Sequence, residues 1–180
     1  MHELDAFLET AERNLNDSLQ HFEEAGSGRA QEFVEIKLQA CIFQYDICSE
    51  MVNLIRNQPS GFAACVATKG LVLRLFEYDD LLNTHIIPRL LTLAKARNIN
   101  VDRTEIKAQR SKWKTEFNQL RSWSDVRNQA AGHYGKNIPT QVALLQTLTV
   151  DVVMTVAKAF LSFNMSLLQI LRSAGLNNAA

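Results

Sequence analysis

The stretch Ala30–Arg56, AQEFVEIKLQACIFQYDICSEMVNLIR, carries two separate apolar faces at the spacing of an α-helix. One face is formed by Phe33, Ile36, Ala40, Phe43, Ile47, Met51 and Leu54. The other face is formed by Leu38, Cys41, Tyr45, Cys48, Val52 and Ile55. A helix that is apolar on more than one side must be covered on more than one side. The stretch therefore predicts a long helix in the middle of a helical bundle.

The rest of the chain also favours helix. Among 180 residues, 47% of them hydrophobic, only 7 glycines and 3 prolines are available to interrupt helices. Most of the other residue types have good helix propensity, and a chain of this length can bury one sizeable core. We therefore predict an all-α fold with a single domain over residues 1–180, an antiparallel bundle of about five to seven helices.

Apolar residues at three- and four-residue steps predict two further long helices in the first half of the chain. One helix is expected at about Glu3–Glu24, and the other at about Phe62–Arg97. Pro88 lies inside the second of these. Proline lacks the amide hydrogen that a helix interior uses and disfavours helix in the residue before it. A kink or break is therefore expected near Thr84–Pro88.

Capping residues predict the helix boundaries in the second half. Asp102, with Glu105 three residues later, is expected to begin a basic helix that runs to about Leu120. Ser124 is the expected N-cap of the next helix, which a glycine would close. The segment KNIPTQ, residues 136–141, is expected to be a loop.

The last helix, expected to start near Thr149 or earlier, contains the most apolar run of the chain, Ala159–Leu171. This run is shorter than the roughly 20 apolar residues that cross a bilayer, and polar side chains interrupt it. No apolar leader follows Met1, and three cysteines do not indicate a disulfide framework. We therefore expect a cytoplasmic protein without a membrane span. The apolar stripe of the last helix is broad enough for burial in the bundle or for subunit pairing.

Charge is unevenly distributed along the chain although the totals cancel. Residues 1–58 hold 4 Lys or Arg and 11 Asp or Glu, a net charge of −7, whereas residues 89–136 hold 11 and 4, a net charge of +7. A positive segment attracts anionic ligands, nucleic acid included. The two segments can equally be neighbouring helices that pair their charges, so both interpretations are open.

Signatures of metal or cofactor binding are missing from the sequence. The four histidines are scattered, with no His-x-x-x-His, Cys-x-x-Cys or glycine-rich phosphate loop. In the segment FEYDD, Glu77, Asp79 and Asp80 are interpreted as a solvated helix face rather than as metal ligands. Cys41 and Cys48 are expected to be buried apolar residues. We expect no cofactor.

The stretch Arg121–Asn137, RSWSDVRNQAAGHYGKN, is the candidate functional site, because it brings Arg127, Asn128 and His133 within seven residues. On a continuous α-helix, Arg127 and His133 would lie roughly 120° apart around the axis. If Gly132 ends the helix, the histidine leaves the helical path and can turn back toward the arginine. Histidine can exchange a proton near neutral pH, and arginine can bind a phosphate with two hydrogen bonds.

The segment VRNQAAGHY, residues 126–134, resembles the Arg-x(4–6)-His signature of the HEPN superfamily, in which a polar residue, often asparagine, follows the arginine. The bundle, with the motif near the end of the penultimate long helix, is also similar to HEPN domains. The resemblance implies a metal-independent ribonuclease, of a kind common in toxin–antitoxin and phage-defence systems, that acts as a homodimer. It implies attack of a ribose 2′-hydroxyl on the adjacent phosphate, which leaves a cyclic phosphate.

In the reaction that this resemblance implies, His133 is the acid–base group, Arg127 stabilises charge on the phosphate in the transition state, and Asn128 orients. The RNA-binding candidates beside them are Arg121, Trp123, Tyr134 and Lys136. Two motifs that meet across a two-fold axis would supply two histidines to one cleft. The partners implied are a second copy of the chain, an RNA substrate, and an antitoxin or other protein.

A purely structural interpretation accounts for the same residues. Arg127 would pair with Asp125 or Glu116, and His133 would cap the last carbonyls of its helix. The domain would then be a non-catalytic helical module that binds a protein partner or nucleic acid, as in the HEPN members without demonstrated catalysis. For Trp123, a place in the core and a place on a base-binding surface are equally open.

Overall fold

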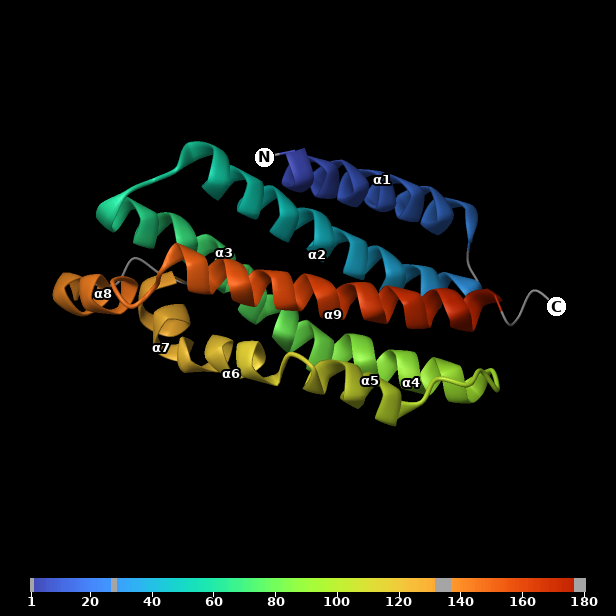
Figure 1. Ribbon diagram of the computed structural model, residues 1–180. Coiled ribbons are helices and arrows are strands. Elements are labelled where there is room, and N and C mark those ends of the chain that lie inside the picture. The colour runs from blue at the N-terminus through green and yellow to red at the C-terminus, as the bar shows by residue number, and fades with distance from the viewer. Residues whose placement is uncertain (1, 27–28, 132–136, 177–180) are drawn as a thin grey trace.

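A computed structural model describes residues 2–26, 29–131 and 137–176 of the chain (Figure 1). Every regular element within these ranges is helical, which confirms the predicted all-α class. The elements are α1 (His2–Glu24), α2 (Arg29–Asn57), α3 (Gly61–Leu81), η1 (Leu82–Ile86), α4 (Ile87–Ala96), α5 (Arg103–Ser111), α6 (Lys114–Ser122), α7 (Ser124–Val126), η2 (Arg127–Ala131), α8 (Ile138–Leu145) and α9 (Val150–Leu176).

Helix α2 lies in the middle of the bundle, as its two apolar faces predict. Figure 1 shows α1 along one side of α2, and helices α3 and α9 also pack against α2. Ile36 and Ile47 are fully buried in the main core. On the other face, Cys41 Sγ lies 3.2 Å from Ser18 Oγ of α1, and Cys48 is also buried. Both cysteines are therefore core residues, as expected.

Helix α9 is the second central helix. It contacts α2, α3, α5 and α6, and the ring of Phe160 lies 4.2 Å from that of Phe117 on α6. Most of its apolar stripe is buried in the bundle, as expected for the first of the two roles predicted for it. Exposed apolar side chains on α9 are Val152 and Met165.

The length of α9 corrects the argument made from its most apolar run. Over Val150–Ser173 it is the one described helix that is long and apolar enough to cross a membrane, and half of the 18-residue stretch that meets this criterion is buried inside the bundle. The run Ala159–Leu171 is thus only part of a longer apolar helix. Burial inside the fold accounts for this composition equally well, because a helix that is hydrophobic all round is either a core helix or a membrane span.

At the kink or break expected near Thr84–Pro88, the structure has a single π-turn, η1, and the chain stays helical through it. Helix α3 continues into η1 without interruption, and the Ile87 N–H donates to the Leu82 carbonyl five residues back. Pro88 then lies in the first turn of α4, where its missing amide hydrogen costs least. One wider turn therefore accommodates the proline, and the helix continues beyond it.

The basic helix expected from Asp102 to Leu120 is two helices. Its start is as predicted, since the Thr104 N–H donates to Asp102 Oδ1 at 2.7 Å. The chain then leaves α-helical geometry at residues 112–113, between α5 and α6, although no glycine or proline marks that point. Trp113 is half-buried there, so packing against the bundle and not local propensity decides this boundary.

Two other boundaries in this half were predicted wrongly. Ser124 is the first residue of α7 and not its cap. The expected loop at residues 136–141 contains the start of α8, where Asn137 Oδ1 accepts from the Thr140 N–H at 3.2 Å. Pro139 is compatible with this helix because it lies in the first turn, whose amides have no partner within the helix.

Candidate active site

The arginine of the motif begins a second π-turn. After the short helix α7, residues Arg127–Ala131 form η2, which packs against α3 and α8 at the left end of the bundle in Figure 1. The separation of roughly 120° expected between Arg127 and His133 assumed a regular α-helix, and residues 127–131 do not have that geometry. π-Turns within helices are rare and occur frequently at functional sites. The motif is thus locally unusual in its backbone as well as in its residues.

Arg127 is exposed, and its position is supported by an aromatic ring. Its guanidinium carbon lies 5.6 Å from the ring centroid of Phe76 on α3. Within the described part of the chain it forms no ion pair, so the pairing with Asp125 or Glu116 that a purely structural role required is not observed. An arginine against a ring face keeps its N–H edge available for an anion.

Asn128 follows on the same π-turn and is also exposed. The arginine and asparagine of the motif therefore both lie on the surface at one end of the molecule. His133, Tyr134 and Lys136 lie outside the described residues, as does Gly132. The direction of the His133 ring, on which the acid–base role depends, stays a prediction.

The two remaining RNA-binding candidates differ in their burial. Arg121 is exposed on α6 and donates to Asn118 Oδ1 at 3.5 Å. Trp123 is only 5% exposed and belongs to the core with Leu120 and Val126. These three residues follow one another at three-residue steps, which point them to the same side of the chain. The base-binding role for Trp123 is therefore wrong in this structure, because its ring has almost no free surface.

The acidic segment FEYDD is only partly the solvated face that was expected. Glu77 and Asp80 are exposed, whereas Asp79 is half-buried and its Oδ1 lies 2.5 Å from the guanidinium of Arg110 on α5. No group of three potential metal ligands occurs among the described side chains. Asp79 therefore has a structural partner that the sequence alone did not indicate.

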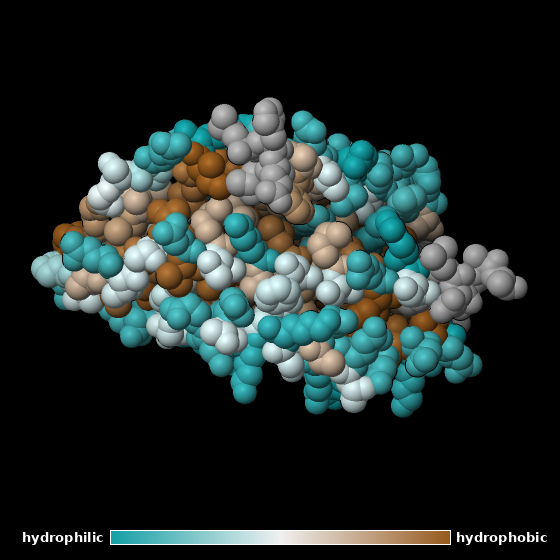
Figure 2. Space-filling model, in the orientation of Figure 1, coloured by the Kyte–Doolittle hydropathy of each residue, from teal (hydrophilic) through white to brown (hydrophobic). Residues whose placement is uncertain are grey.

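Most of the basic side chains that the structure describes in residues 89–131 form no ion pair. One ion pair among the described residues joins the basic segment to the acidic segment, Arg89 to Glu35, while Arg110 pairs with Asp79 outside that segment. Figure 2 shows hydrophilic side chains along the lower edge of the molecule, where Figure 1 places α5 and α6. The interpretation that the two segments neutralise one another accounts for little of this charge, and a positive region remains.

No protein-family model, no curated protein and no solved structure matches this chain.

Proposed function

We propose that this chain is a metal-independent endoribonuclease of HEPN type, with Arg127, Asn128 and His133 as its catalytic residues. The observation that carries the proposal is the state of Arg127, which is exposed, rests against Phe76 and is free of any ion pair in the described ranges. A surface arginine without a carboxylate partner is available to bind a phosphate with two hydrogen bonds. Asn128, exposed beside it, can hold a further oxygen of the same substrate.

In the proposed reaction, the ribose 2′-oxygen attacks the adjacent phosphorus while a base accepts its proton. The bond from phosphorus to the 5′-oxygen breaks, an acid protonates that oxygen, and a 2′,3′-cyclic phosphate remains. Arg127 would stabilise the negative charge that grows on the non-bridging oxygens. A histidine can serve in either proton transfer, because its pKa is ordinarily near neutrality.

The reaction needs one group that accepts a proton and one that donates a proton, but each motif has only one histidine. A homodimer would supply the second histidine. The apolar stripe of α9 is buried, so a dimer interface at the motif must use other surfaces. Exposed apolar side chains near the starts of α3, α8 and α9 include Phe62, Ile138 and Val152. Figure 1 shows these three helix starts at the same end of the bundle as α7. A two-fold axis there would bring two motifs together.

The test is cleavage of a single-stranded RNA by purified protein in excess chelator, followed by analysis of the product ends. We expect fragments with 2′,3′-cyclic phosphates. Loss of one acid–base group costs about 10²–10⁴-fold in rate, and His133→Ala should lose at least this much because it removes both histidines of a shared cleft.

The matched control is Arg13→Ala, which removes an exposed arginine on α1. It should cleave like the wild type. Absence of cleavage by the wild type would favour the non-catalytic module that binds nucleic acid or a protein partner. Equal cleavage by the wild type and His133→Ala would contradict the acid–base role of His133.

A further inference from the structure

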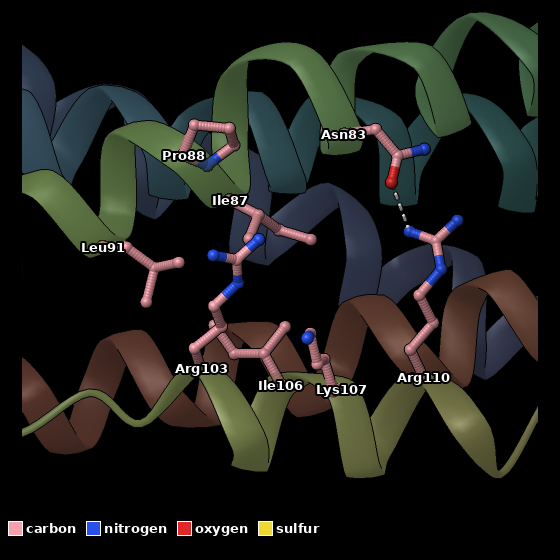
Figure 3. A pocket seen from close by; sticks show the side chains of 8 residues that line it. All are labelled: Asn83, Ile87, Pro88, Leu91, Arg103, Ile106, Lys107 and Arg110. Carbon is pink, nitrogen blue, oxygen red and sulfur yellow. Dashed lines mark hydrogen bonds between the residues drawn. The ribbon is translucent and has the colours of Figure 1, made fainter.

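A cleft of about 480 Å³ lies between α4 and α5, and none of its lining residues belongs to the Arg127 motif (Figure 3). Its eight lining residues are Asn83, Ile87, Pro88, Leu91, Arg103, Ile106, Lys107 and Arg110. The first four come from η1 and α4, and the last four from α5. Its volume falls within the roughly 300–1,000 Å³ that is typical of small-molecule sites.

One wall of the cleft is basic. Arg103, Lys107 and Arg110 lie at steps of four and three residues on α5, and Figure 3 shows their charged ends on the side that faces η1 and α4. Arg110 is held in place, since it donates to Asn83 Oδ1 at 2.9 Å and pairs with Asp79. Its guanidinium also lies 4.4 Å from the ring centroid of Phe117. It therefore forms a fixed end of the cleft whose charge is already balanced.

Arg103 and Lys107 are different, because neither has a carboxylate within ion-pair distance among the residues that the structure describes. Both side chains are exposed. Like charges four residues apart on a helix repel one another. An anion between them would relieve this repulsion and accept hydrogen bonds from both, so these two residues are the part of the cleft that lacks a partner.

The opposite wall is apolar. Ile87 and Leu91 are half-buried, Pro88 lies between them in the chain, and Ile106 is 3% exposed on the α5 side. None of the eight lining residues is aromatic, so the cleft offers no ring on which a nucleic acid base could stack. Its walls fit an aliphatic group on one side and an anionic group on the other.

We propose that this cleft binds a small organic anion in which a phosphate or carboxylate is joined to an aliphatic chain. The anionic group lies between Arg103 and Lys107, and the chain lies along Ile87, Pro88 and Leu91. Apolar surface would supply much of the affinity, and the two cations would fix the orientation of the ligand and select its charge.

Isothermal titration calorimetry with octyl phosphate as the probe tests the proposal, with inorganic phosphate and octanol as separate titrations of the same full-length chain. We expect octyl phosphate to bind at least about tenfold more tightly than either of the other two, a difference of about 1.4 kcal/mol. Its affinity should fall as salt is added, since exposed charges are screened.

The variant Arg103→Gln/Lys107→Gln should weaken octyl phosphate binding by about tenfold or more and remove its dependence on salt. The matched control Lys95→Gln/Lys114→Gln removes the same number of charges from exposed lysines that do not line the cleft, and it should bind like the wild type. Far-UV circular dichroism of both variants establishes that the helices are intact.

Three results would overturn the proposal. The first is that octyl phosphate does not bind. The second is that the cleft variant and the control variant lose binding equally. The third is that the protein binds vesicles of anionic lipid but not free octyl phosphate. The last result would assign the two cations to a membrane surface and leave the cleft without a ligand.

Discussion

Replacement of Tyr78 by phenylalanine tests the hydrogen bonds in the middle of the bundle. The Tyr78 hydroxyl of α3 donates to Asn164 Oδ1 of α9, and Asn164 Nδ2 donates to the Ala40 carbonyl of α2 at 2.9 Å. Tyr78 is 3% exposed and Asn164 is fully buried. Burial raises the pKa of the Tyr78 phenol, so the hydroxyl stays protonated and remains a donor. Three central helices are thus joined by one short chain of polar contacts.

Tyr78→Phe removes one donor while keeping the aromatic ring. That ring stacks on Phe43 with centroids 3.5 Å apart and planes inclined by 6°, and this contact should be retained. The Asn164 oxygen is left buried without its donor, which costs about 1–3 kcal/mol. With about 2–4 °C per kcal/mol for a chain of this size, a loss of 2 kcal/mol lowers Tm by about 4–8 °C.

Asn164→Leu removes both polar atoms and leaves the Tyr78 hydroxyl buried without an acceptor, so we expect a loss of about 2–4 kcal/mol. In the double variant neither member of the pair is left unsatisfied, and its loss should be smaller than the sum of the two single losses by about 1–2 kcal/mol. Urea unfolding followed by far-UV circular dichroism measures all three free energies of unfolding.

The control is Tyr45→Phe on α2, since the Tyr45 hydroxyl makes none of the hydrogen bonds found in the described part of the chain. It should change stability by less than about 0.5 kcal/mol. If the loss in the double variant equals the sum of the losses from Tyr78→Phe and Asn164→Leu to within about 0.3 kcal/mol, the two groups are not coupled, which contradicts this prediction.

Three further predictions concern charge and pH. Asp79→Ala should destabilise the protein by about 2 kcal/mol in urea unfolding, because Arg110 then keeps its charge in a half-buried site without a carboxylate. Burial raises the pKa of the Cys48 thiol from 9.0 to about 11, so the free energy of unfolding should fall as pH rises from about 9 to 11. Cys48→Ala should make this fall smaller, which urea midpoints measured across that pH range would show. Hydrogen bonds from Thr104 lower the pKa of the Asp102 carboxyl from 3.8. The Asp102 carboxylate should therefore stabilise α5 fully above pH 3.8, and this stabilisation should disappear as pH falls through the lowered pKa. Asp102→Asn should make the acid transition smaller in far-UV circular dichroism.

The positions of the long helices could be predicted from the sequence because each carries a regular apolar pattern. The two faces of Ala30–Arg56 required cover on two sides, and the structure supplies it with α1 on one side and α3 and α9 on others. The turns that depart from this pattern were not predictable. The first π-turn, η1, is one wider turn within a continuous helix, and the second, η2, follows α7 directly. The sequence shows only that Pro88 or a polar motif is present at these points.

The candidate site shows a similar division. The residue types at Arg127 and Asn128 indicated phosphate chemistry. The absence of an ion pair between Arg127 and any other described residue depends on how α3, α7 and η2 pack, which no local pattern encodes. The basic positions Arg103 and Lys107 were visible in the sequence as part of a charged segment. That they face Ile87 and Leu91 across a cleft depends on tertiary structure, since the two walls are separated in the chain.

We propose that Arg127 acts on the phosphate of an RNA substrate. The most direct test compares single-turnover cleavage of RNA in excess chelator by the wild type, Arg127→Lys and Arg127→Ala. Loss of one group that stabilises transition-state charge costs about 10²–10³-fold, so Arg127→Ala should cleave at least that much more slowly. Arg127→Lys, which keeps the charge but not the two parallel hydrogen bonds, should fall between the two. Equal rates for the wild type and Arg127→Ala would contradict the account.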